Sequence, residues 1–303
     1  MKNFQGKVAV ITGGASGLGR EFANSAAKLG MKLVLADVQQ DALDKAKAEL
    51  EVGGASVLAM ICDVRKGEQV QALADATMAK FGAVHLLFNN AGVGSGGLIW
   101  ENTEADWEWV LGVNVWGVAH GVRIFTRLML ECAKTDPQFE GHIVNTASMA
   151  GLLNAPTMGV YNVSKHAVVS LSETLYHDLQ LVDAPIGASV LCPYFVPTGI
   201  SQSHRNRPAD VAMTEGVTAS QKAAQAMTVK AVESGKVSAA DVAGITFDAI
   251  RDGQFYIYSH PQALGGVAER MGDIVNARNP SDPYKSTPHV RELLRSKMGY
   301  TAA

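Results

Sequence analysis

The sequence predicts an α/β fold, a Rossmann-like doubly wound parallel β-sheet flanked by helices on both faces, in a single domain. Short, continuous apolar runs alternate with longer amphipathic segments along most of the chain. A glycine-rich turn follows the first apolar run and leads directly into a helical pattern. Continuous apolar strands are buried on both faces, and parallel strands need helical crossovers, so the alternation favours this fold.

The composition is that of a globular protein without a bias toward nucleic acid or membranes. The chain has 303 residues, of which 47% are hydrophobic, and a formal net charge of -3, so one large domain or two small ones fit its length. It has no run of Lys and Arg, and no apolar run near the ~20 residues of a membrane span. We expect no nucleic-acid and no membrane partner. The N-terminus lacks the apolar core of a signal peptide, which predicts a cytoplasmic location.

Cysteine and histidine are too scattered to indicate a metal site. The three cysteines, Cys62, Cys132 and Cys192, are an odd number in no paired spacing, which disfavours a disulfide framework or a zinc knuckle. No two of the eight histidines stand in a ligand spacing such as His-Glu-x-x-His. We therefore predict no bound metal.

The first sixty residues follow the order strand, glycine turn, helix, strand. A strand is expected over residues 7–12 and a helix over 20–29. The glycines between them permit a tight turn and let backbone N–H groups approach a pyrophosphate at the positive end of the helix. The spacing Gly-x-x-x-Gly-x-Gly would alone also fit a plain helix entry. The candidate cofactor-binding residues of the turn are Gly13, Ser16, Gly17, Leu18 and Gly19.

An acidic residue ends the second strand, which is expected over residues 32–36. Asp37 lies there, eighteen residues after Gly19, where a carboxylate can accept both hydroxyl groups of an adenosine ribose. The same carboxylate would repel a 2'-phosphate, and neither Ser16 nor Val38 offers a compensating positive charge. We therefore predict NAD rather than NADP as the cofactor.

The alternation then continues through two helices and two strands. These are expected over residues 41–51 (helix), 56–61 (strand), 68–80 (helix) and 84–88 (strand). Asp63 and Val64 follow one strand, and Asn90 and Gly92 follow the other, so all four are placed beside the expected cofactor crevice. Asp63 can accept a hydrogen bond from an adenine amino group there. We take these four as candidate cofactor-binding residues, although Asn90 and Gly92 also fit plain turn positions.

The segment 107–127 is helical in composition but carries a weak centre. Its middle residues Gly112, Val113 and Asn114 are poor helix formers. An amide in an apolar stretch needs a partner, which a local break holding a water would supply; a buried Asn bonded to backbone is the alternative. The following residues 131–141 are expected to form a long surface loop.

The next strand delivers a serine toward a tyrosine and a lysine. Ser148 follows the strand expected over residues 143–147, while Tyr161 and Lys165 lie one turn apart at the start of a helix over 161–180. An ammonium ~4 Å from a phenol would lower its pKa by about three units, so that Tyr161 exchanges protons near neutrality. Ser148 can then hydrogen-bond the oxygen whose proton the tyrosinate takes. A Tyr-x-x-x-Lys pair with a solvated lysine is also common on amphipathic helices.

Taken in order, these motifs resemble the short-chain dehydrogenase/reductase family. They are Thr12-Gly13-x-x-x-Gly17-x-Gly19, Asn89-Asn90-Ala91-Gly92, Asn114, Ser148 and Tyr161-x-x-x-Lys165. The resemblance implies a nicotinamide-dependent oxidoreductase that forms a homodimer or homotetramer. It implies Tyr161 as acid/base, Ser148 as the orienting hydroxyl and Lys165 as the ribose-binding charge. It also implies that Asn114 supports a proton-relay water.

A strand over residues 186–191 leads into a segment that the resemblance places at the nicotinamide. Pro193 follows the strand, and the resemblance implies that the backbone of Val196 and the hydroxyl of Thr198 contact the cofactor carboxamide. Many family members carry glycine where Tyr194 stands. A bulky tyrosine there would wall the nicotinamide or substrate pocket.

The rest of the chain divides into a lid and a tail. Residues 199–234 are a candidate substrate lid, polar at first and then helical. Residues 260–303 are expected as a C-terminal extension that packs on the same domain or on a neighbouring subunit. The remaining residues, 1–259, would form the dinucleotide-binding and catalytic domain. Further elements are expected over residues 239–251 (helix), 254–258 (strand) and 290–297 (helix).

These features favour NAD(H)-dependent interconversion of a secondary alcohol and a ketone. The expected pocket residues are mostly apolar, which favours a lipophilic or aryl substrate; they are Val93, Met149, Leu152, Leu153, Met158, Tyr194 and Phe195. One alternative is an NADP-linked carbonyl reductase, which Asp37 disfavours. The other is a non-catalytic nicotinamide-sensing protein, which would be expected to have lost Ser148, Tyr161 or Lys165.

Overall fold

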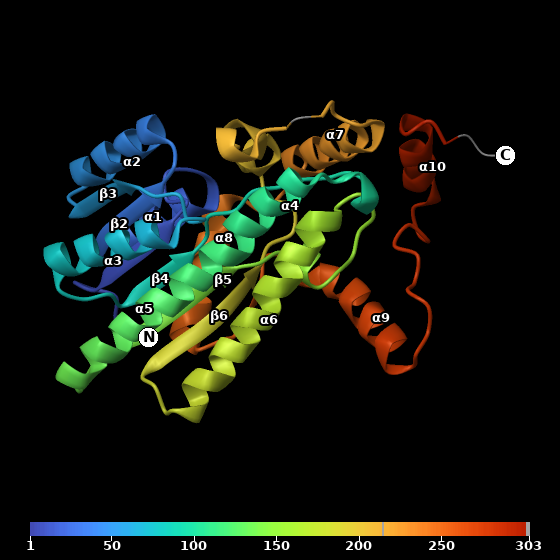
Figure 1. The fold of residues 1–303 in the computed structure, drawn as a ribbon. Coiled ribbons are helices and arrows are strands. Elements are labelled where there is room, and N and C mark those ends of the chain that lie inside the picture. Colours follow the sequence, from blue (N-terminus) through green and yellow to red (C-terminus); the bar gives the residue numbers. More distant parts are fainter. Residues whose placement is uncertain (214, 301–303) are drawn as a thin grey trace.

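The computed structural model describes residues 1–213 and 215–300 as one seven-stranded parallel sheet between layers of helices (Figure 1). The strand order is β3-β2-β1-β4-β5-β6-β7. The strands are β1 (Val8–Thr12), β2 (Lys32–Asp37), β3 (Val57–Ile61), β4 (Leu86–Asn89), β5 (Gly141–Thr146), β6 (Ile186–Cys192) and β7 (Tyr256–Tyr258). The predicted Rossmann-like doubly wound fold is confirmed.

Helices connect the strands and continue after the last one. Among the described residues these are α1 (Gly17–Lys28), α2 (Gln40–Val52), α3 (Gly67–Phe81), α4 (Glu104–Leu111), α5 (Gly117–Thr135), α6 (Gly159–Leu181), α7 (Ala219–Glu233), α8 (Ala239–Asp252), α9 (Leu264–Val275) and α10 (Pro288–Lys297). Three of them begin with a reciprocal capping box, formed by Thr103 at α4, Thr218 at α7 and Ser238 at α8. Such caps satisfy N–H groups that a helix cannot pair internally, and so fix where these helices begin.

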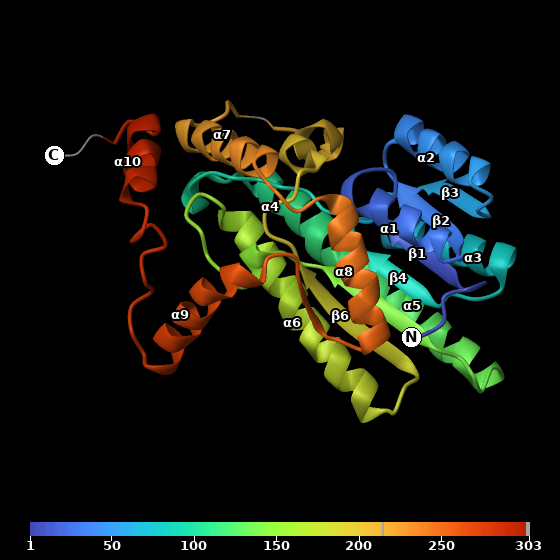
Figure 2. The same ribbon diagram turned by 180° about the vertical axis from the view of Figure 1, so that it is seen from behind.

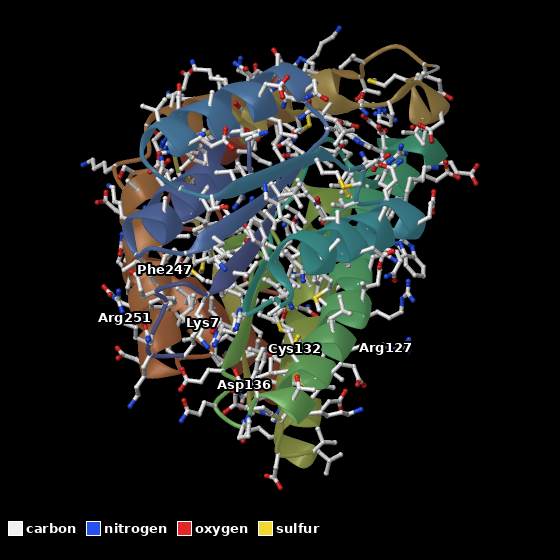
Figure 3. All side chains as sticks on the ribbon, turned by 90° about the vertical axis from the view of Figure 1, so that its left-hand side faces the viewer. Lys7, Arg127, Cys132, Asp136, Phe247 and Arg251 are labelled. Atoms are coloured by element: carbon white, nitrogen blue, oxygen red, sulfur yellow. The ribbon has the colours of Figure 1, made fainter. Side chains whose placement is uncertain are left out.

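The sheet is buried on both faces because apolar side chains from two helix layers pack against it. On one face the core includes Phe247 of α8 together with side chains of α1 and α2. On the other it includes Phe125 of α5 together with side chains of α3 and α6. Figure 3 shows Phe247 and Arg251 on one side of the molecule, and Arg127 and Cys132 of α5 on the other. This burial explains why the central strands have continuous apolar sequences.

The order of the strands reverses beside β1. This strand pairs with β2 on one side and with β4 on the other, in both cases parallel. In open parallel sheets the carboxyl ends of the strands leave a crevice at such a reversal, where ligands bind. The turn after β1 and the ends of β2 to β6 therefore border a candidate ligand site.

The weak centre predicted within residues 107–127 is a π-helical turn within a continuous run of helical backbone. A π-helical turn, Gly112–Trp116, separates α4 from α5, and Asn114 lies within it. A single π turn adds a residue to the helix and commonly marks a functional position.

The prediction of a surface loop over residues 131–141 was wrong for the first half of that segment. Helix α5 continues to Thr135, because Met129 is fully buried and Cys132 and Ala133 pack against the same core. Burial of this apolar face extends the helix beyond the point where its composition becomes polar. Only a short connection remains before β5.

The C-terminal part of the chain stands apart from the sheet. Figures 1 and 2 show α9 and α10 beyond α6 and α7, on the side away from α2 and β3, and α10 contacts α7. Helix α9 was not predicted. Its apolar residues do recur at helical spacing, and Leu264 and Val267 pack against the core, whereas Met271, Ile274 and Val275 are exposed.

Candidate active site

One large cavity, of about 1310 Å³, lies at the carboxyl ends of the strands. Its walls come from the glycine turn, the ends of β2 to β6, the start of α6, the segment before and within α7, and the C-terminal part of the chain. Of the predicted site residues, the cavity wall includes Gly13, Ser16, Gly17, Leu18, Asp37, Asp63, Val64, Asn90, Gly92, Ser148, Tyr161, Lys165, Pro193, Val196 and Thr198. Only Gly19 and Asn114 lie outside it. The fold thus brings together residues from distant parts of the chain.

The glycine turn has the shape that its sequence predicts. Gly13 (φ 64°) and Gly17 (φ 54°) adopt left-handed conformations that glycine tolerates best. A Cβ on Gly13 would lie 3.0 Å from Ala91 Cα, and one on Gly19 would overlap the Gly13 carbonyl oxygen. Ser16, the N-cap residue of α1, makes no side-chain capping bond. The first N–H groups of α1 can therefore receive an anionic group from the cavity.

Asp37 is held in a fixed position at the end of β2. Its Oδ1 accepts hydrogen bonds from the backbone N–H groups of Val38 (2.8 Å) and Gln39 (3.2 Å). Its Oδ2 accepts one from Ala15 N (3.1 Å), within the glycine turn. A carboxylate has about four acceptor positions, so this group can accept further bonds from hydroxyl groups in the cavity.

Asp63, at the end of β3, is paired with a residue that sequence reasoning did not single out. The Arg65 guanidinium donates to both oxygens of Asp63, with Nη2 2.7 Å from Oδ2 and Nε 3.1 Å from Oδ1. The backbone N–H of Arg65 also donates to Oδ1 (3.0 Å). Nε also lies 3.0 Å from Oδ2, so each oxygen of Asp63 already accepts two bonds from Arg65.

Asn90 ties the end of β4 to the glycine turn. Its amide nitrogen donates to Thr12 O (3.0 Å), and its backbone N–H donates to Thr12 Oγ1 (2.9 Å). Gly92 lies close to the catalytic candidates, since a Cβ there would be 3.5 Å from both Asn114 Oδ1 and Lys165 Nζ. In the protein alone, Asn90 therefore positions the turn.

Ser148 and Tyr161 meet at the cavity surface. Ser148 Oγ accepts from Ala150 N (3.1 Å) and lies 3.3 Å from Pro193 O, to which it donates. The Ser148 hydroxyl is close enough to the Tyr161 phenol to lower its pKa. Ser148 follows β5, and Tyr161 lies in the first turn of α6. The turn Met149–Gly151, which begins after Ser148, packs against α6 and holds the two residues together. They are placed to bind one substrate oxygen between them.

The expected effect of Lys165 on the phenol is not found in the protein alone. Lys165 Nζ donates to Thr146 O (2.9 Å) and lies 5.7 Å from the Tyr161 ring centroid. Burial lowers the pKa of Lys165 to about 8 and raises the pKa of Tyr161, while the nearby Ser148 hydroxyl opposes that rise. The prediction of an acidic phenol neglected desolvation, which is the largest cause of the shift in the pKa of Tyr161.

Asn114 is fully buried and its amide is bonded to protein groups. Oδ1 accepts from Val93 N (2.9 Å), and Nδ2 donates to Val93 O (3.0 Å) and to Ser164 Oγ (3.0 Å). Of the two alternatives that the sequence left open for Asn114, the side chain thus follows the second, in which a buried Asn bonds the backbone. It fixes the chain after β4 against α6, close to Lys165.

The segment after β6 forms the far wall of the cavity. Pro193 O accepts from Met149 N (2.9 Å), which joins this wall to the Ser148 segment. Tyr194 is 45% exposed, and its ring lies 4.5 Å from that of Phe195 and 5.8 Å from that of His260. Tyr194 therefore presents an aromatic surface to the cavity, as its size predicts.

The C-terminal contribution to the cavity was missed by sequence reasoning. Residues between Gly266 and Ser286, Arg270 and Tyr284 among them, line its outer part. The sequence gives no signal for this, because it carries no motif and the proximity depends on how the tail folds back. Among the described residues, no three His, Cys, Asp or Glu side chains are grouped to hold a metal ion, and no helix is long and apolar enough to cross a membrane.

Comparisons with known proteins agree with this arrangement. A model of the short chain dehydrogenase family matches residues 7–209. The CLA biosynthesis dehydrogenase/reductase of Lactiplantibacillus plantarum is 34% identical, over 92% of this chain and 97% of that protein. The C alpha-dehydrogenase of Sphingobium sp. is 33% identical, over 97% and 94%.

A solved structure is similar along nearly the whole chain. The short chain dehydrogenase/reductase from Burkholderia phymatum, crystallised in complex with NAD, has a TM-score of 0.91 and 55% sequence identity, over 93% of this chain and 99% of that one. Fold, family model and relatives therefore agree. The chain belongs to the short-chain dehydrogenase family of oxidoreductases.

Proposed function

We propose that this protein is an NAD(H)-dependent dehydrogenase that interconverts a secondary alcohol and a ketone on a lipophilic or aryl substrate. The observation that carries the proposal is the meeting of two hydroxyls, on Ser148 and Tyr161, in the same cavity as the glycine turn and Asp37. A pair of hydroxyls can hold and protonate one carbonyl oxygen. The turn and the carboxylate suit the phosphates and ribose of a dinucleotide.

The protein's own residues would orient the substrate and move its proton. Ser148 holds the substrate oxygen, and Tyr161 donates a proton to that oxygen in reduction or removes it in oxidation. When bound, the nicotinamide supplies the hydride acceptor for oxidation and the donor for reduction. Lys165 would bind the nicotinamide ribose, and the segment from Pro193 through Val196 to Thr198 would orient the carboxamide.

The raised pKa of Tyr161 has a consequence for direction. Burial keeps the phenol protonated at neutral pH, so the site is ready to act as a general acid on a carbonyl oxygen. Oxidation needs the tyrosinate, whose population grows as the pH rises. We therefore propose that the oxidation rate increases with pH, while reduction is favoured at lower pH.

Asp37 supports NAD over NADP. The carboxylate is fixed by three backbone N–H groups and lines the cavity together with the uncharged Val38 and Gln39. A 2'-phosphate would be repelled there. The NAD complex of the similar Burkholderia phymatum protein agrees with this choice.

The lining near Ser148 and Tyr161 supports an apolar substrate. Its apolar side chains come from several elements, and they are Val93, Met149, Leu153, Met158, Tyr194 and Phe195. Burying aliphatic or aromatic groups against this surface would supply binding energy without a charged partner. We further propose a cytoplasmic homodimer or homotetramer, which light scattering of the purified protein would test.

A substrate screen tests the proposal. The protein is incubated with NAD and a panel of aliphatic, alicyclic, aryl and steroidal secondary alcohols, and formation of the reduced cofactor is followed by absorbance. We expect turnover with apolar alcohols, and none for Tyr161→Phe, which should still bind NAD. Faster turnover with NADP would favour a carbonyl reductase. NAD binding without turnover of any alcohol, or of the matching ketones with NADH, would favour a sensing protein.

A further inference from the structure

An arginine joins the cofactor side of the cavity to the candidate lid. Arg65 follows β3, and its guanidinium bonds Asp63 as described above. The same guanidinium also donates to Asp210, with Nη1 3.3 Å from Oδ2 and Nη2 3.2 Å from Oδ1. Asp210 belongs to a short helical turn, Ala209–Val211, within the lid. One side chain thus bridges two carboxylates that lie far apart in the sequence.

The lid is attached at a second point, of a different kind. Arg207 Nη1 lies 2.5 Å from Asp106 Oδ1, and both side chains are more than nine-tenths buried. Arg207 also donates to Val211 O (2.6 Å) and lies over the Trp109 ring. Opening this attachment would leave buried charges unpaired, so it would hold this part of the lid against α4 while the exposed pair separates.

The Arg65–Asp210 pair is the attachment that can open. The Arg65 side chain is 11% exposed, but that of Asp210 is 52% exposed, so water can replace Arg65 when the pair separates. Arg65 would keep its bonds to Asp63 after separation. The lid would then stay attached at the buried pair and through Ser203 and Ser220, which accept from Gly94 N and Leu98 N, while the turn that carries Asp210 is free.

The pair also lies where it would matter for a bound dinucleotide. Asp63, Val64 and Arg65 line the cavity from the β3 side, and Asn206 and Pro208 line it from the lid. Figure 1 shows the segment before α7 above the carboxyl ends of the strands. The pair thus links two walls of the cavity at the end where Asp63 would receive adenine.

We propose that Arg65 is a positioning residue that latches the lid over the adenosine half of the dinucleotide site, an inference that rests on the proposed function. It holds the Asp63 carboxylate in place for adenine, and it holds Asp210, and with it the lid, across the path by which the cofactor leaves. Release of the cofactor requires separation of Arg65 from Asp210. Closure of the lid over substrate and retention of the cofactor are therefore one event.

The test is the rate of cofactor release from Asp210→Asn, measured by stopped-flow fluorescence with NAD, ADP-ribose and nicotinamide mononucleotide. We expect release of NAD and ADP-ribose to be about two- to fivefold faster than from the wild type, in line with a partly exposed ion pair. Nicotinamide mononucleotide lacks the adenosine half, and its release should not change. The matched control is Asp248→Asn, which removes an exposed carboxylate paired with Arg251 on α8.

A combined variant separates the latch from a general effect on folding. Lys66 Nζ also lies 3.9 Å from Asp210 Oδ2, so the background is the variant that combines Arg65→Met with Lys66→Met. Adding Asp210→Asn to this background should not accelerate release further, because both partners of the carboxylate are already gone. Raised salt should reduce the difference between Asp210→Asn and wild type. Release of NAD at the wild-type rate from Asp210→Asn, or equal acceleration of all three ligands, would overturn the latch. A wild-type protein that binds no NAD would instead overturn the proposed function.

Discussion

Replacing Asp37 tests the choice of cofactor most directly. In Asp37→Ala the carboxylate that would accept the ribose hydroxyls is gone, and so is the charge that would repel a 2'-phosphate. Three backbone N–H groups also lose their acceptor, those of Ala15, Val38 and Gln39. Asp37→Asn is the sharper variant, because its side-chain oxygen can still accept from Val38 and Gln39 while the negative charge is removed.

The magnitude follows from hydrogen bonding and charge. A hydrogen bond to a charged acceptor is worth ~1.5–3 kcal/mol, so losing the ribose contacts should raise the KM for NAD by ~10- to 100-fold in Asp37→Ala. A phosphate charge ~5 Å from the carboxylate, at an effective dielectric of ~20, is repelled by ~3 kcal/mol. Removing that repulsion should improve kcat/KM for NADP by ~100-fold.

The assay is steady-state kinetics with each cofactor, using one alcohol from the substrate screen. The ratio of kcat/KM for NAD to that for NADP should fall by ~10³- to 10⁴-fold in Asp37→Ala, and by at least ~10²-fold in Asp37→Asn. Asp41→Asn is the control, because that carboxylate is exposed in the first turn of α2. A thermal melt of each variant measures the effect on folding separately. An unchanged ratio in well-folded Asp37→Asn would show that this carboxylate does not select the cofactor.

Three further predictions concern the lysine, the cysteines and one glycine. The charge of Lys165 is lost as the pH rises through its pKa of about 8, so the dissociation constant for NAD, measured by fluorescence, should increase above that pH and should lack this step in Lys165→Met. A thiol reagent at mild pH should label Cys132 in the native protein but not Cys62 or Cys192, which are buried with pKa values raised to about 12; mass spectrometry identifies the labelled residues. A Cβ at position 151 would lie 2.6 Å from Lys165 O, so Gly151→Ala should push the serine segment away from α6 at an overpacking cost of ~1–3 kcal/mol. Steady-state kinetics should show kcat lowered by ~5- to 150-fold, which corresponds to that cost, with a smaller change in the KM for NAD.

Local patterns predicted the sheet and the cofactor side of the cavity well. The strands are continuous apolar runs because helices cover both faces of the sheet. The turn from Gly13 to Gly19 is recognisable because its backbone needs glycine, at Gly13 and Gly17 for a left-handed conformation and at Gly19 for space. In each case the physical cause acts within a few neighbouring residues, so a short stretch of sequence is enough to predict the structure there.

Features that depend on distant partners were not predictable in the same way. Arg207 and Asp106 are 101 positions apart, and Arg65 and Asp210 are 145 apart. Neither pair has a spacing that a motif could express. The pKa of Tyr161 was misjudged for a related reason, because burial depends on everything that packs around the phenol. Contacts and desolvation of this kind are properties of the folded chain.

The two halves of the cavity are therefore built by different means. The half with the glycine turn and Asp37 is shaped by backbone geometry at strand ends, which a short stretch of sequence determines. The other half is closed by the lid and by the C-terminal residues from Gly266 to Ser286, whose position depends on long-range packing. The candidate cofactor-binding residues belong to the first kind of construction, and the walls around the proposed substrate space belong largely to the second. For this reason the reaction class can be inferred from local motifs, while the substrate has to be found by binding and turnover measurements.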